Sequence, residues 1–359
     1  MRPPRRAHGA WRVLFALAAL VIVLPVACLV FLGLLQGRDL AAALRALRAP
    51  APAAVAEPVA LPPAPFGPAL YAGSLLDHEL GEVSGLAASR RSPGVLWAVN
   101  DGGNAHRLFA LSLEGERLAA WNVAVPEDRW WGDSDWEDLA SFRYEGAPYL
   151  LIADVGDNWS WRKRVRLWIV PEPDLAEPAV PLVPRWRIEL AYADGPHDCE
   201  AVAVDETDLS LLLISKRTAP PLLYGAELAP LLRAGGGEAL ARPLGPVRVP
   251  PPPSERADAF TPAVLYMPTA LDLAPDGSAA VVLGYAAAWR FPRAAGERWA
   301  EAFARTPEQI ALPPLVMAEA VAYVGGSLFV TSEVDRFALV RWRAPLLRFD
   351  PLAHAGDGS

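Results

Sequence analysis

Carboxylate side chains return at intervals along this chain, each time at the start of a short run of small and apolar residues. Glutamate opens three of these runs, at Glu137, Glu200 and Glu319. Carboxylate oxygens are the ligands that hard divalent cations such as Ca²⁺ prefer, and carboxyl groups also serve as general acids and bases. The residues that open the runs are therefore the first candidates for chemistry. The five runs are Ser84–Ala87, Glu137–Ala140, Glu200–Ala203, Thr269–Asp272 and Glu319–Ala322.

The repetition of these runs predicts the fold. Each run is followed by a turn and a second apolar strand, and a spacing of roughly 40–70 residues is typical of propeller blades or similar arrays. We count four antiparallel strands per repeat but three in the last, whose third strand we expect at residues 337–342. A strand near residues 69–76 is expected to complete that last blade, because a closed ring leaves few strand edges unprotected. The prediction is an all-β propeller of five four-stranded blades; a six-bladed alternative places an irregular blade at residues 243–268.

One end of such a ring should collect the polar residues. The start of the first strand and the end of the second lie at the same end of a blade, because the two strands run antiparallel. This places the repeat glutamates near Asp101, Asp157, Lys216 and Arg217, which follow second strands, and near Glu82, which precedes a first strand. Ca²⁺ takes six to eight oxygen ligands and suits this set. The candidate metal ligands are Glu82, Glu137, Glu200, Glu319 and Asp157.

Glutamates held around one axis repel one another and lose solvent on burial, so something must offset the cost. A bound calcium ion is the arrangement we expect, and ion pairs with Lys216 or Arg217 are the first alternative. Protonation of one or two glutamates in a solvated acidic pocket is the second. Zinc is disfavoured because the sequence has no His/Cys cluster at ligand spacing. The candidate catalytic residues are Asp101, Asp157 and His197, with His197 otherwise a loop residue, and the candidate substrate-binding residues are Lys216, Arg217 and Trp136.

A membrane anchor precedes the repeats. Residues 13–35 carry no charge and are almost wholly apolar, and a helix needs about 20 such residues to cross a bilayer core. Four arginines lie before this segment, which favours a cytoplasmic N-terminus. A cleaved signal peptide is the alternative, and a lipoprotein signal at Cys28 is a weaker one. The expected organisation is a cytoplasmic segment at 1–12, a transmembrane anchor at 13–36, a short helix and Pro/Ala-rich linker at 37–68, the propeller at 69–345 and a tail at 346–359.

Composition and charge narrow the class of protein. The net charge is -8, and no basic block follows the anchor, which argues against a nucleic-acid partner. Cys199 is the one cysteine outside the anchor, so no intramolecular disulfide is expected there. The expected location is the inner or plasma membrane, with a single pass and the propeller in the periplasm or outside the cell. The expected partners are the membrane, through the N-terminal helix, and a small molecule or a cell-envelope ligand; no oligomeric state is indicated.

Several motifs resemble those of largely uncharacterised bacterial extracytoplasmic propeller proteins. This group is loosely similar to esterase-like or phytase-like propellers and to lactonase-type propellers, the gluconolactonases and paraoxonases. The resemblance implies a propeller with an axial calcium site that hydrolyses esters, lactones or phosphoesters. The lactonase-type enzymes carry a His or Asp base over the metal, which has no assigned counterpart in this sequence, and they are typically six-bladed. The motifs are Glu82–Ala87, Leu96–Asp101, Asp135–Ala140, Asp154–Asn158 and Asp198–Ala201.

Two functions from different classes fit the sequence. The first is a metal-dependent hydrolase in which the glutamates hold the cation and Lys216 or Arg217 holds an anionic substrate. The second is a non-catalytic, membrane-tethered binding module for a cell-envelope ligand or protein. Propellers host both kinds of function, so the fold by itself does not choose between them.

Overall fold

The computed structural model describes residues 61–126, 134–177, 180–250, 266–315, 317–333 and 343–352. The predicted cytoplasmic segment at 1–12, the predicted anchor at 13–36 and the predicted linker up to residue 60 lie outside these residues. None of the helices in the described ranges is long and apolar enough to span a membrane. The described chain is otherwise built almost entirely from β-strands.

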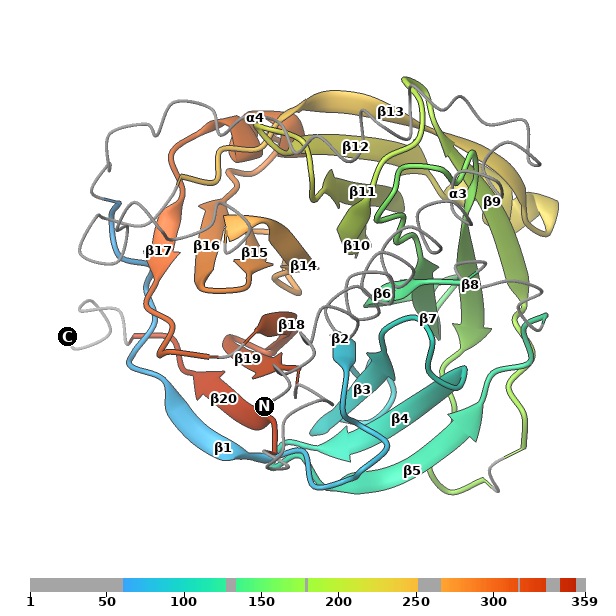
Figure 1. Cartoon of the computed structure of the whole chain (residues 1–359), viewed down its shortest axis with the longest axis horizontal. Helices are drawn as coiled ribbons and strands as arrows, with labels where there is room; N and C mark the ends of the chain where they lie inside the picture. The colour runs from blue at the N-terminus through green and yellow to red at the C-terminus, as the bar shows by residue number, and fades with distance from the viewer. Residues whose placement is uncertain are drawn as a thin grey trace, which may run out of the picture. The chain divides into compact units, whose positions relative to one another are not determined.

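The strands form four-stranded units, each of which contains one of the sequence repeats (Figure 1). In the first four units, neighbouring strands pair antiparallel in sequence order. The first unit consists of β2 (Val83–Ala88), β3 (Val95–Asn100), β4 (Arg107–Ser112) and β5 (Arg117–Asn122). The second consists of β6 (Trp136–Tyr144), β7 (Ala147–Asp154), β8 (Val165–Pro171) and β9 (Trp186–Tyr192).

The other units repeat this plan with two variations. The outer strands of the second and third units pair in parallel, β13 with β9, so these two units share one eight-stranded sheet. The third unit consists of β10 (Cys199–Asp205), β11 (Ser210–Ser215), β12 (Leu222–Glu227) and β13 (Gly237–Pro246). The fourth consists of β14 (Pro268–Leu273), β15 (Ala279–Gly284), β16 (Ala287–Pro292) and β17 (Glu308–Ile310), and the fifth of β18 (Ala318–Val324), β19 (Ser327–Ser332), β20 (Pro345–Phe349) and β1 (Leu70–Ser74).

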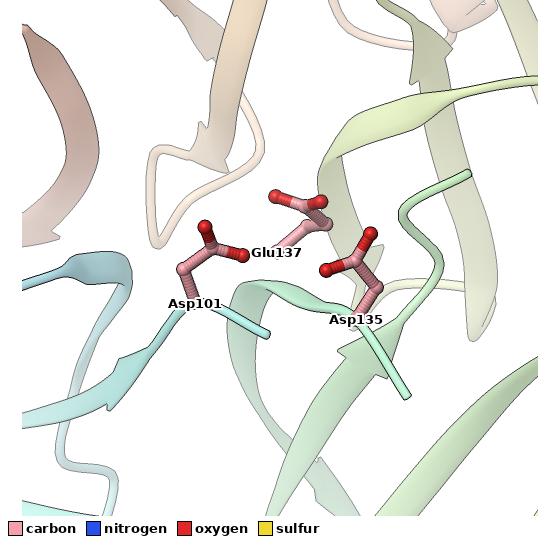
Figure 2. Close-up of side chains that lie close together, drawn as sticks. All are labelled: Asp101, Asp135 and Glu137. Atoms are coloured by element: carbon pink, nitrogen blue, oxygen red, sulfur yellow. The ribbon is translucent and has the colours of Figure 1, made fainter. Parts of the chain in front are cut away.

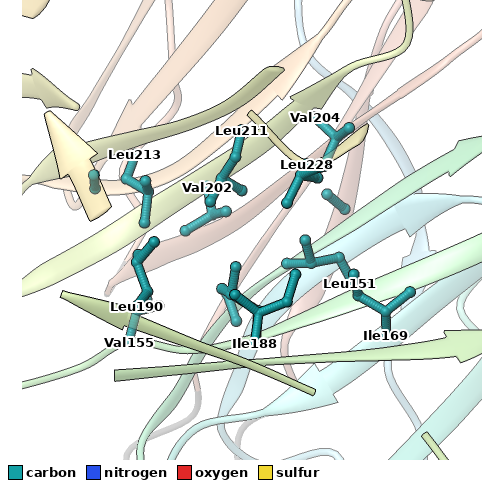
Figure 3. Close-up of a cluster of buried hydrophobic side chains, with 14 of the residues drawn as sticks. Leu151, Val155, Ile169, Ile188, Leu190, Val202, Val204, Leu211, Leu213 and Leu228 are labelled. Carbon is teal, nitrogen blue, oxygen red and sulfur yellow. The ribbon is translucent and has the colours of Figure 1, made fainter. Parts of the chain in front are cut away.

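The units follow one another around a common centre in a propeller-like arrangement. The first strands of the units are innermost, and they contact one another in the cyclic order β2, β6, β10, β14, β18 and back to β2. Buried apolar clusters lie between the first and second units, the second and third, the third and fourth, the fourth and fifth, and the fifth and first. Figure 3 shows the cluster between the second and third units, where side chains of β7, β8 and β9 face those of β10 and β11. Burial of such side chains, at about 1.5–3 kcal/mol each, holds each unit to its neighbours.

The ring closes between the two ends of the described chain. β1 pairs antiparallel with β20, in agreement with the expectation that an N-terminal strand completes the last unit. The third strand of that unit, however, is β20 and begins at Pro345. The predicted strand at 337–342 lies outside the described residues, and the tail predicted from residue 346 contains most of β20. The alternation of buried and exposed residues in Leu346–Phe349 is weak because the strand is so short.

The predicted linker, 37–68, overlaps residues that pair with the sheets. Pro63 forms a parallel bridge with Gln309 of β17, and Phe66 forms an antiparallel bridge with Pro351. The Ala64 amide donates to the Gln309 carbonyl at 2.8 Å, and the Ala64 side chain is buried. The residues from 61 onward therefore cover the outer edge of the fourth unit. Proline and alanine favour an extended linker by composition, but extended backbone also suits pairing at a strand edge.

Two short helices were not expected from the sequence. α3 (Ala229–Ala234) lies between β12 and β13, and α4 (Trp299–Ala304) lies between β16 and β17. The Glu301 carboxylate accepts the Arg298 amide at the start of α4, and Trp299 and Phe303 are buried in the cluster between the third and fourth units. Each helix has six residues, which is too short for a periodic apolar pattern to stand out in the sequence.

Candidate metal centre

Every innermost strand contains a β-bulge at the first residue of its repeat. In β6, Trp136 pairs with Asp154 and Asp138 pairs with Ala153, so Glu137 between them has no partner on β7. A bulge redirects the side chain of its extra residue and is common next to functional sites. The polar residues that open the repeats are therefore set apart by the backbone as well as by residue type. The five bulge residues are Ser84, Glu137, Glu200, Thr269 and Glu319.

Two of the bulge residues join neighbouring units. The Ser84 hydroxyl donates to the Trp136 carbonyl at 3.0 Å, and the Thr269 hydroxyl donates to the Ala318 carbonyl at 2.9 Å. Both acceptors directly precede the bulge residue of the next unit, so the two bonds are equivalent by repeat. Both hydroxyl residues are buried. A short hydroxyl side chain at this position thus has a structural role, and the three glutamates remain for chemistry.

Three carboxyl groups converge at one point of this end of the ring. One carboxylate oxygen each from Asp101, Asp135 and Glu137 lies within 4.8 Å of the other two (Figure 2). Asp101 directly follows β3, Asp135 directly precedes β6, and Glu137 is the bulge residue of β6. Glu137 is buried, and the two aspartates are partly buried. We call these three residues the acidic cluster. Three carboxylates supply up to six oxygens, so the cluster could hold a divalent metal ion.

Burial and mutual repulsion raise the pKa values of the whole cluster. Burial, followed by repulsion from Asp135 and Glu333, raises the pKa of Asp101 to about 7. Burial raises the pKa of Asp135 to about 6, although the nearby Arg162 opposes the shift. Burial, and then Glu200 and Asp101, raise the pKa of Glu137 well above its usual range. A cation would remove this repulsion by neutralising the charge.

A glycine forms a wall of the cluster. A Cβ atom on Gly156 would contact the Glu137 carboxylate and would lie 2.6 Å from Asp135 Oδ2. Its φ angle lies outside the left-handed region, so close approach to the carboxylates, rather than backbone conformation, favours glycine here. The Gly156 amide donates to the Asp135 carbonyl at 3.2 Å. The space beside the carboxylates therefore depends on this residue having no side chain.

Glu200 is engaged by a lysine rather than by the acidic cluster. The Lys216 ammonium group forms a buried ion pair with Glu200 and donates to the Tyr285 hydroxyl at 2.7 Å. Burial by itself would lower the pKa of Lys216, but the charges of Glu200 and Glu137 outweigh it and raise that pKa. Lys216 therefore stays charged, and it faces carboxylates of the ring. The alternative that a lysine or arginine pairs with the repeat glutamates is therefore confirmed for Glu200.

Glu319 lies on the same side and is paired with another carboxyl group. It forms a side-chain hydrogen bond with Glu333, which follows β19. Burial, and then Glu333, raise the pKa of Glu319 to about 10. A hydrogen bond between two carboxyl groups requires a proton on one of them. The Glu319–Glu333 pair therefore holds a proton, which is the arrangement that the second alternative from the sequence describes.

The loop after β7 is fixed by an arginine. Arg162 donates to Asp154 Oδ1 and to the Gly156 carbonyl, both at 2.7 Å. Asp157 Oδ2 accepts the Arg162 amide at 2.6 Å, and the Asp157 amide donates to Asp198 Oδ1 at 3.0 Å. Asp157, a candidate ligand and catalytic residue, therefore holds the loop that carries Gly156, and it is not one of the three convergent carboxylates. Those bonds give the wall of the cluster a fixed position.

The remaining candidates lie around the cluster in other roles. Arg217 Nε contacts Asp198 Oδ2 at 2.5 Å, and its guanidinium also donates to Asn158. Glu82 accepts from Asn104 Nδ2 at 2.7 Å, and its carbonyl accepts the Asp101 amide. His197 Nε2 contacts Asp194 Oδ1 at 3.0 Å and the Tyr224 hydroxyl at 2.8 Å. Trp136 is buried, and its indole stacks on His106 with 4.9 Å between ring centroids.

Asp135, one of the three carboxylates of the cluster, was not among the candidate metal ligands, and Asp138 at the centre of the ring was not a candidate. Asp135 holds the repeat position that Glu82 and Asp198 hold in other units, and that equivalence was the available signal. Asp138 stands where the other repeats have Gly85, Ala201, Ala270 and Ala320. It is fully buried, and its carboxylate accepts amides from three innermost strands: Leu139 of β6 at 2.8 Å, Val202 of β10 at 2.8 Å and Leu271 of β14 at 3.1 Å.

The raised pKa values predict how stability changes with pH in metal-free buffer. The folded-state pKa values of Asp101 and Asp135, about 7 and about 6, lie above the ordinary value of 3.8 for an aspartate. The folded state therefore binds these protons more tightly, and stability falls as pH rises through this range. We expect the melting temperature in chelator to fall between pH 5 and pH 8, and Asp101→Asn to flatten that fall and to raise the melting temperature at pH 8. Melting curves recorded by tryptophan fluorescence at four pH values check this prediction. It is contradicted if the melting temperature of Asp101→Asn falls with pH as much as that of the wild type.

The known proteins that match this chain are solved structures. No protein-family model matches the chain, and no curated protein matches it. A chain in the crystal structure of a nidogen/laminin complex matches with a TM-score of 0.36 and 14% identity, over 72% of this chain and 74% of that chain. Hydrazine synthase of Kuenenia stuttgartiensis matches with a TM-score of 0.33 and 11% identity, over 75% of this chain and 61% of that chain. The chain thus spans less than two thirds of that second protein chain, and the fold assignment rests on the strand pairing described above.

Proposed function

We propose that the protein binds one calcium ion at the acidic cluster and that this ion is the centre of a hydrolytic site. The convergence of Asp101, Asp135 and Glu137 within 4.8 Å of one another is the observation that carries the proposal. The three carboxylates come from two neighbouring units, and all have raised pKa values that a cation would lower. An all-oxygen donor set favours a hard cation such as Ca²⁺ over Zn²⁺, which takes histidine and cysteine as well.

The reaction class that fits such a centre is hydrolysis of an ester, a lactone or a phosphoester. When bound, the ion would polarise a carbonyl or phosphoryl oxygen. The chain itself contributes the loop around Gly156, which Arg162 fixes next to the carboxylates. Lys216 supplies a positive charge in the neighbouring third unit, where it is paired with Glu200. This reaction class agrees with the resemblance of the motifs to esterase-like and lactonase-type propellers.

A non-catalytic binding module is the second candidate, and one observation favours it. The residues that the sequence assigned to substrate or to catalysis are already engaged: Lys216 with Glu200, Arg217 with Asp198, and His197 with Asp194 and Tyr224. In this alternative the calcium ion orders the loops of one face, which bind a cell-envelope ligand. In both cases we propose a five-bladed propeller that is anchored to the inner or plasma membrane and lies outside the cytoplasm.

Calorimetric titration of calcium into the chelator-treated full chain in detergent micelles tests the cation site. We expect binding close to one ion per chain. Glu137→Gln removes one negative ligand from the cluster and should weaken binding by about tenfold or more, because affinity follows ligand charge. Glu301→Gln is the matched control, because Glu301 is exposed on α4 and pairs with Arg298. Absence of calcium binding in the wild-type chain, together with equal melting curves in calcium and in chelator, would reject the cation site.

A further inference from the structure

A serine that directly precedes a residue of the acidic cluster in the sequence is in hydrogen-bond contact with a histidine. Ser134 Oγ is 3.1 Å from His106 Nε2. Ser134 directly precedes Asp135 of the cluster, and His106 directly precedes β4 of the first unit. Neither residue belongs to the repeat pattern, and neither was a candidate from the sequence. A hydroxyl within reach of an imidazole nitrogen is the geometry of an activated nucleophile.

The structure holds both members of the pair in fixed positions. The His106 ring stacks on the Trp136 indole, with 4.9 Å between ring centroids and 27° between the planes. The backbone next to Ser134 is fixed because the Asp135 amide donates to Asp154 Oδ1 at 2.9 Å. Trp136 is the first residue of β6, so the strand that positions Glu137 also positions the surface on which the imidazole stacks. Stacking and backbone bonds of this kind limit the orientations available to both side chains.

We propose that Ser134 and His106 are a nucleophile–base pair for hydrolysis of carboxylic esters or lactones. This assignment rests on the proposed calcium site, because negative charge that develops on the substrate oxygen next to three carboxylates requires a cation to stabilise it. With its proton on Nδ1, His106 accepts at Nε2 from the Ser134 hydroxyl. His106 is the base that the resemblance to lactonase-type propellers left unassigned, and the nucleophile makes the route covalent.

The reaction has two halves, acylation of Ser134 and hydrolysis of the acyl-enzyme, and water is the only co-reactant. Ser134 Oγ forms a bond to the acyl carbon while its proton moves to His106 Nε2. The bond from the acyl carbon to the leaving oxygen then breaks, and that oxygen takes the proton from His106. In the second half, His106 removes a proton from water, the hydroxide oxygen bonds to the acyl carbon, and the bond to Ser134 Oγ breaks. The serine regains its proton from His106, and the carboxylic acid is released.

Covalent labelling of the full chain in detergent micelles tests the pair. A small alkyl fluorophosphonate should form a P–O bond to Ser134 with loss of fluoride, and peptide mass spectrometry locates the adduct. Ser134 is 7% exposed, so labelling also measures whether a reagent reaches it. With p-nitrophenyl butyrate as substrate, Ser134→Ala and His106→Gln should each lower kcat by about 100-fold or more. Ser134→Cys keeps a nucleophile and should retain an acyl-enzyme burst, which a merely structural hydroxyl would not give.

A matched control separates catalysis from packing. Thr269→Val removes a buried hydroxyl bond between two other units, from Thr269 to the Ala318 carbonyl. It should change kcat by less than twofold and leave the labelling of Ser134 intact. Labelling in calcium but not in chelator supports both the pair and the cation site, and equal labelling in both supports the pair but contradicts the role of the cation. An unlabelled Ser134 in a wild-type chain that binds calcium overturns the pair and leaves the cation site standing.

Discussion

Asp138→Ala is expected to lower the free energy of unfolding by about 3 kcal/mol or more. The Asp138 carboxylate accepts the amides of Leu139, Val202 and Leu271, which belong to three different innermost strands. Each buried donor that loses its acceptor costs about 1–3 kcal/mol. Alanine fits the position sterically, because three of the other repeats have alanine there. The loss should therefore come from the unsatisfied amides and not from a steric clash, and urea unfolding in chelator measures it.

Two comparisons make this result specific. Asp138→Asn keeps one oxygen acceptor but turns an amide group toward a backbone donor. Its loss of unfolding free energy should therefore lie between zero and that of Asp138→Ala. Asp208→Ala is the control, because Asp208 accepts the amide of Ser210 two residues away in an exposed turn. Its loss of unfolding free energy should stay below about 1 kcal/mol. An Asp138→Ala chain that unfolds at the wild-type urea midpoint would show that the carboxylate does not hold the innermost strands together.

Gly156→Ala is expected to weaken calcium binding by about 10–100-fold, the range that residues supporting metal ligands usually show. The new methyl group would contact the Glu137 carboxylate and approach Asp135 Oδ2 to 2.6 Å, so at least one ligand must move. The backbone of Gly156 is not in the left-handed region, and the fold itself should tolerate alanine. The expected signature is a large loss of calcium affinity with a small change in the melting temperature measured in chelator.

Gly81→Ala provides the matched control for this prediction. Gly81 lies in the same face of the ring, just before Glu82, and a Cβ atom there would meet no heavy atom within 4 Å. Its calcium affinity should equal that of the wild type. If Gly156→Ala also binds calcium with wild-type affinity, the ion does not lie between Glu137 and Asp135, and the geometry proposed for the site is wrong.

The repeat pattern determined most of the fold. A polar residue before small and apolar residues recurs five times, and each copy begins an innermost strand. Small residues are required there because innermost strands approach closely: a Cβ atom on Gly85 would lie 2.6 Å from the Leu139 amide nitrogen of the next unit. Trp97, Trp121 and Trp168 are buried in one cluster between the first and second units. Such features depend on local periodicity and residue size, which a sequence displays directly.

The strands at the outer edges of the units were harder to predict from the sequence. Residues 61–67 have a linker composition but pair with β17 and with Pro351, and β20 lies where a tail was expected. Strands at an outer edge are short and bury little, so their patterns are weak. Pairing partners that are far apart in the chain decide whether such a segment is a strand, and the segment itself carries little sign of them.

The sequence by itself determined that acidic residues gather at one end of the ring, because the repeat fixes where each glutamate stands along its strand. Only the tertiary structure decided which of them could bind a metal. Glu137 meets Asp101 and Asp135, Glu200 is neutralised by Lys216, and Glu319 pairs with Glu333. Equivalent positions diverge because a carboxylate responds to whatever charge or donor lies within a few ångströms. Asp101 comes from the adjoining first unit, whereas Lys216 and Glu333 follow the second strands of the same units as Glu200 and Glu319. The residue at the end of the second strand differs from repeat to repeat, and only the folded chain shows which residue lies next to each glutamate.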